Sequence, residues 1–248
     1  CLFLILILGI SHGALDNIKG KKLFKIFGYK SSVYFYLAYI FISILIVASW
    51  LCFPNTVLFI FLVVASYHFG KEDTVFSFKR KFLISEFLFF LKGSSIILMP
   101  LLLKKAETIE IFRILNFNVF ELSIFTDQFL IVTLFLSFLS SLYISQKKNA
   151  NLIGIMVMDF FSLFILNFFL TPVLAFTLYF CFLHSIRHSI KLIFELDKSI
   201  KSGLRKFISR AIPLTLVTGV IFLLAIFFLN NFYKLDEAIY KVIFIGLA

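Results

Sequence analysis

The chain has 248 residues, of which 61% are hydrophobic and 15% charged, and its formal net charge is +11. Soluble domains average roughly 45–50% apolar and about 25% charged residues, so this composition excludes an ordinary soluble fold. Apolar runs longer than the roughly 18 residues that span a bilayer recur along the chain, without the alternation of barrel strands. We therefore expect an all-α, polytopic integral membrane helical bundle, because helices satisfy their own backbone hydrogen bonds in lipid.

Apolar runs bounded by charge or proline predict about nine helices in a single transmembrane bundle domain, residues 1–248. Pro54 and Pro172 stand in very short connections, where one helix must end and the next begin. At about 1.5 Å per residue the first and last runs are too short to span, so we expect both to be truncated in this sequence. In chain order, the predicted helices are 1–15, 33–53, 55–70, 82–103, 127–145, 152–170, 172–194, 207–230 and 236–248.

The basic residues separate into two sets when alternate loops are compared. Of the 24 lysine and arginine residues, 17 lie in the loops after the first, third, fifth and seventh helices, and 4 lie in the opposite loops. Cytoplasmic loops carry such an excess, so we predict a multi-pass protein of the inner (plasma) membrane with the first set inside. The charge then reflects topology and anionic lipid headgroups, and no nucleic-acid partner is expected.

The four histidines of the chain fall at similar predicted depths near the cytoplasmic face. At about 1.5 Å per residue, His12 and His184 lie ~10 Å, and His68 and His188 ~5 Å, before the first cytoplasmic lysine that follows each. His184 and His188 are four residues apart, so they share one helical face. Interhelical hydrogen bonding is one interpretation of a single such histidine, but four at one depth favour a bound metal ion.

Neutral imidazoles suit iron, copper, zinc or nickel, and the residues alone do not choose between them. Four histidines on an octahedral ion leave up to two positions open for chemistry. Nearby carboxylates are candidates to orient the imidazoles by accepting their second N–H. Asp159 is also a candidate partner for Lys92, and Arg187 is a candidate neighbour of the site or a snorkelling cation. The candidate orienting carboxylates are Asp16, Glu72, Asp73 and Asp159.

Four sequence words, in this order, carry a resemblance to a known family. They are GISHGALDN from residue 9, SYHFGKEDT from residue 66, KGSSIILMP from residue 92 and LHSIRHSI from residue 183. Each word is short, but the stretch from the first to the last, residues 9–190, takes in most of the chain. The sequence resembles the bacterial Brp/Blh family of membrane β-carotene 15,15′-dioxygenases.

The resemblance implies an integral membrane oxidoreductase that uses non-haem Fe(2+) and O₂ to cut the central 15,15′ double bond of β-carotene into two retinal molecules. Carried over by position, the catalytic iron ligands would be His12, His68, His184 and His188. The family pattern also has a Pro-His pair late in the last helix, just after the point where this sequence stops, so a further ligand stays open. A retinal-binding protein is a candidate acceptor of the product.

β-Carotene is wholly apolar and about as long as the bilayer core is thick, so it can reach such an enzyme from lipid. Aromatic residues beside the histidines are candidates to line its tunnel, with ordinary packing as the alternative in a chain with 19% aromatic residues. Other interpretations of the chain are a transporter, a haem or other metal-binding membrane protein, and a retinal receptor with Lys92 or Lys241 as its Schiff base. The candidate tunnel residues are Tyr67, Phe69, Tyr179 and Phe180.

Overall fold

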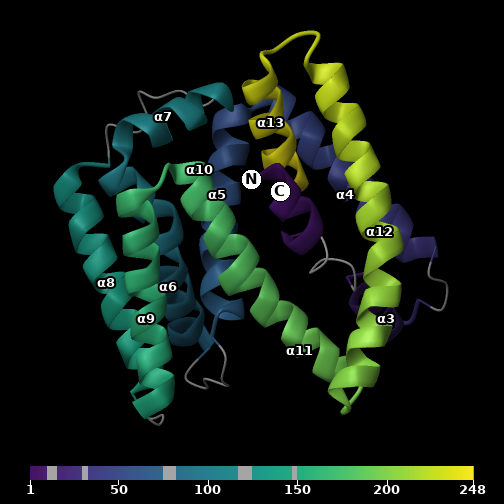
Figure 1. Cartoon of the computed structure of the whole chain (residues 1–248), viewed down its shortest axis with the longest axis horizontal. Coiled ribbons are helices and arrows are strands. Elements are labelled where there is room, and N and C mark those ends of the chain that lie inside the picture. Colours follow the sequence, from purple (N-terminus) through teal and green to yellow (C-terminus); the bar gives the residue numbers. More distant parts are fainter. Residues whose placement is uncertain (10–15, 30–32, 75–81, 117–124, 147–149, 248) are drawn as a thin grey trace. The chain divides into compact units, whose positions relative to one another are not determined.

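The computed structural model describes residues 1–9, 16–29, 33–74, 82–116, 125–146 and 150–247 (Figure 1). These residues are helical almost throughout, and no strand occurs among them, which confirms the all-α prediction. The helices are α1 (Leu2–Leu4), the π-helix η1 (Ile5–Gly9), α3 (Asp16–Ile26), α4 (Val33–Cys52), α5 (Pro54–Glu72), α6 (Phe82–Leu103), α7 (Lys105–Ile114), α8 (Asp127–Ser145), α9 (Ala150–Phe169), α10 (Pro172–Leu178), the π-helix η3 (Tyr179–Ser185), α11 (Ile186–Leu196), α12 (Ile200–Leu229) and α13 (Leu235–Leu247).

Six of the described helical segments are long and apolar enough to cross a membrane, and the chain is a polytopic membrane protein. They are Val33–Cys52, Leu83–Leu103, Asp127–Ser145, Ala150–Phe169, Pro172–Leu196 and Ile200–Leu229. Helix α5 is not one of the six, because its ends carry polar residues, His68 among them. Pro172–Leu196 runs without a break through α10, η3 and α11, as the predicted helix 172–194 requires.

Two helices lie where loops were expected, and a third begins earlier than predicted. Helices α3 and α7 are rich in charged residues, which form helices readily but are missed by a search for apolar runs. At about 1.5 Å per residue neither is long enough to span a bilayer, so neither adds a crossing to those predicted. Helix α12 starts at Ile200 instead of 207 for the same reason, since Lys201, Arg205 and Lys206 extend it.

The described chain forms two compact units. Unit 1 comprises Cys1–Val57 and Phe180–Ala248, and unit 2 comprises Leu58–Tyr179. The boundaries fall within α5 and after the first residue of η3, so both helices run from one unit into the other. The single bundle domain stays a prediction.

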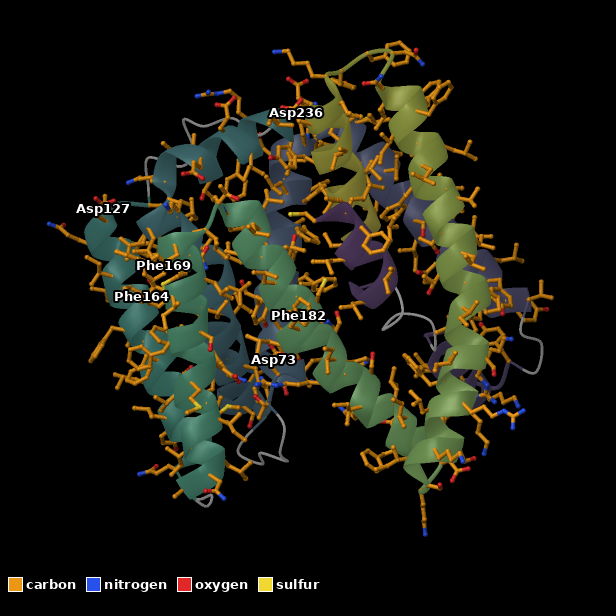
Figure 2. All side chains as sticks on the ribbon, viewed as in Figure 1. Asp73, Asp127, Phe164, Phe169, Phe182 and Asp236 are labelled. Carbon is orange, nitrogen blue, oxygen red and sulfur yellow. The ribbon has the colours of Figure 1, made fainter. Side chains whose placement is uncertain are left out.

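Unit 2 is held together by helices that approach closely through small residues. Helix α6 packs against α8 and α9, as the left part of Figure 1 shows. A Cβ built on Gly70 of α5 would lie 1.8 Å from the backbone oxygen of Phe89, and one on Gly93 of α6 would lie 1.8 Å from that of Ser66. Such backbone contact is how helices associate where lipid removes the hydrophobic drive. Phe169 projects from α9 on the outside of the unit (Figure 2).

Unit 1 is built around the long helix α12. Its N-terminal half packs on α11, where a Cβ on Gly203 would lie 2.4 Å from the backbone oxygen of Ile193. Its C-terminal half packs on α13 and on η1, through an apolar cluster centred on Phe222, Ile226 and Val242. The N-terminal segment of the chain is therefore anchored against its C-terminal helices.

Candidate metal centre

His184 is a buried histidine of unit 1, and it lies in a π-helical stretch of the Pro172–Leu196 segment. Its exposed fraction is 1%, and its ring stacks on that of Phe180 with centroids 5.7 Å apart and planes 17° from parallel. A π-helix has i→i+5 hydrogen bonds, is rare, and occurs frequently at functional sites. The stretch carrying His184 therefore has the local geometry expected of a functional position.

His188 follows His184 in α11, one turn further along the same continuous helix. Its side chain is half-buried, as is that of Arg187. The π-helix ends at Ser185 and the α-helix begins at Ile186, so the pair straddles a change of helical pitch. That the two imidazoles share one ion stays a prediction.

Gly9 brings the N-terminal segment against the ring that stacks on His184. A Cβ on Gly9 would lie 2.6 Å from Cε1 of Phe180, which is closer than real Cβ atoms approach. Phe180 is itself buried, with 4% exposure, so its ring has little room to yield. Gly9 is the last described residue before 10–15, and His12 lies outside the described residues. Gly9, which precedes His12 by three residues, therefore lies against the same Phe180 ring that stacks on His184.

His68 lies on α5 in unit 2, on a face that is exposed, whereas its neighbours Phe69 and Gly70 are buried. Its ring meets that of Phe69 edge-on, with centroids 5.6 Å apart. Within the described residues, which omit His12, no three or more His, Cys, Asp and Glu side chains form a group that could hold a metal ion. The four-histidine site stays a prediction.

The candidate orienting carboxylates occupy different places. Asp73 directly follows α5, is buried, and accepts a hydrogen bond from the hydroxyl of Tyr179 (Figure 2 labels Asp73). Asp159 lines the same small cavity in unit 2 as Asp73 and Lys92. Asp16 is the first residue of α3, and Glu72 is the last of α5. Whether any of them orients an imidazole stays a prediction.

Lys92 crosses from α6 toward the end of α5. Its Nζ donates to Thr74 Oγ1 at 3.0 Å and to the backbone oxygen of Gly70 at 3.4 Å. Burial leaves only 8% of the residue exposed, and the glycine contact between α5 and α6 makes this reach possible. Lys92 therefore lines the same cavity as Asp159, and whether the two compensate each other's charge stays a prediction.

The candidate tunnel aromatics make contacts within their own units. Phe69 meets Phe176 and Tyr179 edge-on, with centroids 6.3 and 5.7 Å apart. The hydroxyl of Tyr67 donates to Glu86, and Lys71 donates to Tyr67. Their role in a tunnel stays a prediction.

Two structural features of this region escaped the sequence reasoning. One is the π-helix itself, for which the letters YFCFLHS give no signal, since they read as an ordinary apolar helix. The other is Gly9, the first residue of the first histidine word, and its place at the end of an apolar run was a usable signal, because small residues let membrane helices approach closely.

The comparisons with known proteins agree with the resemblance found in the sequence. The model of the family Beta-carotene 15,15'-dioxygenase matches residues 3–248. No match was found among curated proteins or among solved structures. The chain belongs to the Beta-carotene 15,15'-dioxygenase family.

Proposed function

We propose that this membrane protein is a non-haem Fe(2+) dioxygenase that cleaves β-carotene at its central 15,15′ double bond into two retinal molecules. Besides family membership, the observation that carries the proposal is the surroundings of His184. This histidine is 1% exposed in an apolar membrane protein, lies in a π-helix, and stacks on a ring that contacts Gly9. A buried ionisable residue at membrane depth indicates a functional site by default.

The residues near His184 fit a bound cation. Ser185 is also 1% exposed, and its hydroxyl has no hydrogen-bond partner among the described residues. The imidazole of His184 and the hydroxyl of Ser185 are two adjacent buried polar groups in apolar surroundings, and iron is one of the metals that imidazole suits. In this proposal His12, His68, His184 and His188 would hold the ion. When bound, Fe(2+) supplies the redox chemistry that allows O₂ to react with a carbon–carbon double bond.

The reaction balances without an external reductant. One C=C bond and the O–O bond break, and two C=O bonds form, so every atom of β-carotene and O₂ appears in the two retinals. The protein's part is to hold one double bond of the polyene at the site and to exclude the others. Substrate and O₂ both partition into lipid, and so does retinal, for which a retinal-binding protein is the proposed acceptor.

The proposed location is the inner (plasma) membrane, with the iron site toward the cytoplasm. The asymmetry of 17 against 4 basic residues between the alternate loops predicted from the sequence, with α5 counted as a crossing, supports this orientation. Helices α3 and α7 do not disturb the count, because each is too short to cross.

The test is retinal formation in a bacterial host that makes β-carotene, with two variants of η3. His184→Ala removes the buried imidazole, and Phe182→Ala removes a neighbouring side chain that is 48% exposed. Both proteins are quantified in the membrane fraction. We expect retinal and loss of orange colour with wild type and Phe182→Ala, and no retinal with His184→Ala.

Retinal production by His184→Ala at the wild-type rate would contradict the proposal. So would a Soret band in the purified wild-type protein, which would identify haem instead of non-haem iron. Unequal aldehyde products would place the cleaved bond elsewhere on the polyene.

A further inference from the structure

The hydrogen bond from Tyr179 to Asp73 joins the two helices that carry His68 and His184. Asp73 is the residue after α5, five positions beyond His68. Tyr179 is the first residue of η3, five positions before His184. Both partners belong to unit 2, and both are buried, with 6% and 3% exposure. The bond therefore lies at the point where the second helix leaves unit 2.

The surroundings hold this pair in place on two sides. Phe69, one turn before Asp73, packs edge-on against the ring of Tyr179 with centroids 5.7 Å apart. The pair also lines a cavity of about 30 Å³, together with Lys92, Asp159 and Ser141. That volume admits a water molecule, which needs about 10–15 Å³, but not a ring of a carotenoid. The Asp73–Tyr179 pair therefore borders a small polar cavity.

Charge explains why a carboxylate is tolerated here. Asp73 shares the cavity with the ammonium group of Lys92, which is held by Thr74 and Gly70 at the end of α5. A buried carboxylate with a hydroxyl donor and a nearby cation is a strong and directional acceptor. A hydroxyl bonded to it is fixed more firmly than one bonded to a neutral group.

The Tyr179–Asp73 hydrogen bond lies at the start of a π-helix, where the position of the first residue affects the residues that follow. A π-helix accommodates one residue more per turn than the helical ladder on either side of it. An α-helix has 3.6 residues per turn, so each residue turns the chain by roughly 100° about the helix axis. If the π-helix formed at a different place in this segment, the residues between the two places would therefore face a direction that differs by about that angle. A contact that fixes the first residue of η3 therefore acts at the start of the helical stretch that leads to His184.

We propose that Tyr179 and Asp73 are positioning residues, whose hydrogen bond pins the start of η3 to the end of α5 and so sets the orientation of His184 for metal binding. The inference rests on the proposed function, because it assigns the pair to the iron site. Neither residue acts as a ligand. Removal of the bond is expected to weaken metal binding without loss of the fold.

The experiment uses purified full-length protein in detergent and compares wild type with Tyr179→Phe. This change keeps the ring against Phe69 and removes only the hydroxyl. Tyr143→Phe is the matched control, because Tyr143 lies on α8 in the same unit and is 41% exposed. Two readouts are made: Fe(2+) affinity by competition with a chelator, and the visible absorption spectrum of the Co(2+)-loaded protein, which reports ligand geometry.

We expect Tyr179→Phe to bind Fe(2+) about 10- to 100-fold more weakly, the range found when a partner that orients a metal ligand is removed. Its Co(2+) spectrum should change, and Tyr143→Phe should match wild type in both readouts. Asp73→Asn keeps an acceptor oxygen but loses the charge, so it should fall between the two. If Tyr179→Phe does not fold, the same prediction is tested with Asp73→Asn.

Wild-type affinity and spectrum in both Tyr179→Phe and Asp73→Asn would overturn the inference while leaving the proposed function intact, provided that His184→Ala loses the metal. A wild-type protein that binds no iron and makes no retinal would overturn the proposed function and the inference together. The two failures are distinct, because one is seen in the variants alone and the other in the wild type.

Discussion

The two units of this protein bury very different residues. Of the 16 polar or charged residues that are buried in the described structure, 13 belong to unit 2 and 3 to unit 1. Those of unit 2 are mostly serines on α6 and α8, and several bond to backbone oxygens within or between helices. Those of unit 1 are His184, Ser185 and Lys241.

This difference follows from the solvent. Lipid is as apolar as the side chains it surrounds, so helices associate through close packing of small residues and through hydrogen bonds. Unit 2 uses both, in the glycine contacts between α5 and α6 and in the bond from Ser137 to the backbone oxygen of Lys92. Unit 1 places two of its three buried polar residues side by side in η3. We interpret unit 2 as a scaffold and η3 as part of a reactive site.

The largest effect is expected when the helix contact in unit 2 is broken. In Gly93→Ala the new Cβ would meet backbone atoms of Ser66, which cannot rotate away. We expect a loss of about 3 kcal/mol, at the upper end for an overpacked site, seen as a lower midpoint of heat denaturation in detergent. Gly154→Ala is the control, since a Cβ there meets nothing within 4 Å. Gly154→Ala should be neutral or stabilising by up to about 1 kcal/mol. Equal denaturation midpoints for the two variants would refute the close contact between Gly93 and the backbone of Ser66.

The second-largest effect is expected for Gly9→Ala in unit 1, which should lower activity more than stability. Gly9→Ala forces the Phe180 ring away from its stacking position on His184. We expect retinal formation to fall about 10- to 100-fold, as for a small misplacement in a catalytic site, with a smaller relative change in unfolding temperature. Gly219→Ala in α12 adds a Cβ to open space and should keep full activity. An active Gly9→Ala variant would show that the ring contact does not matter for the site.

A smaller effect is expected for one interhelical hydrogen bond of unit 2. Ser137→Ala removes the bond between Ser137 Oγ and the backbone oxygen of Lys92, 3.0 Å long. Such bonds contribute about 0.6 kcal/mol in membrane proteins. The control Ser209→Ala removes a bond within α12 on an exposed surface. An unfolding temperature that falls for Ser137→Ala and not for Ser209→Ala would support the view that serine hydrogen bonds stabilise the contacts between helices in unit 2. Equal unfolding temperatures for the two variants would argue against that view.

The smallest effect concerns the turn between α11 and α12 in unit 1. Hydrogen bonds from Lys206, then from Ser202 and the backbone N–H of Ser199, hold the pKa of Asp197 well below its usual value. A lowered pKa stabilises the folded state at pH values above about 3.9, the ordinary value, and this stabilisation is lost as the pH falls through the folded-state pKa. Asp197→Asn should therefore lower the unfolding temperature slightly at pH 7 and not in strong acid. A difference that persists in strong acid would assign the effect to something other than charge.

The sequence predicts the spanning helices well and the polar ones poorly. Apolar runs locate α4, α6, α8, α9 and the segment Pro172–Leu196 within a few residues, because a bilayer imposes length and hydropathy directly. Helices α3 and α7 are missed because no such constraint acts on them, and their charged residues suit a loop as well as a helix. Membrane-spanning helices can therefore be predicted from composition, whereas short helices outside the membrane cannot.

For the candidate site, the sequence supplies residue types and approximate depths but not contacts. The histidine words and their order predict the family, which the match over residues 3–248 confirms. The bond between Tyr179 and Asp73 joins residues 106 positions apart in the sequence, and the apolar residues around His184 give no sign of a π-helix. No pattern of neighbouring letters encodes such a pairing.

The most direct test of the central claim is the stoichiometry of the reaction with purified protein. The protein is loaded with Fe(2+) without oxygen, mixed with β-carotene in detergent and exposed to O₂, and the retinal formed is counted against the β-carotene consumed. We predict two retinals for each β-carotene, one iron per chain, and neither product nor bound iron in His184→Ala. Cleavage without iron, or with an intact His184→Ala rate, would contradict a histidine-held iron site.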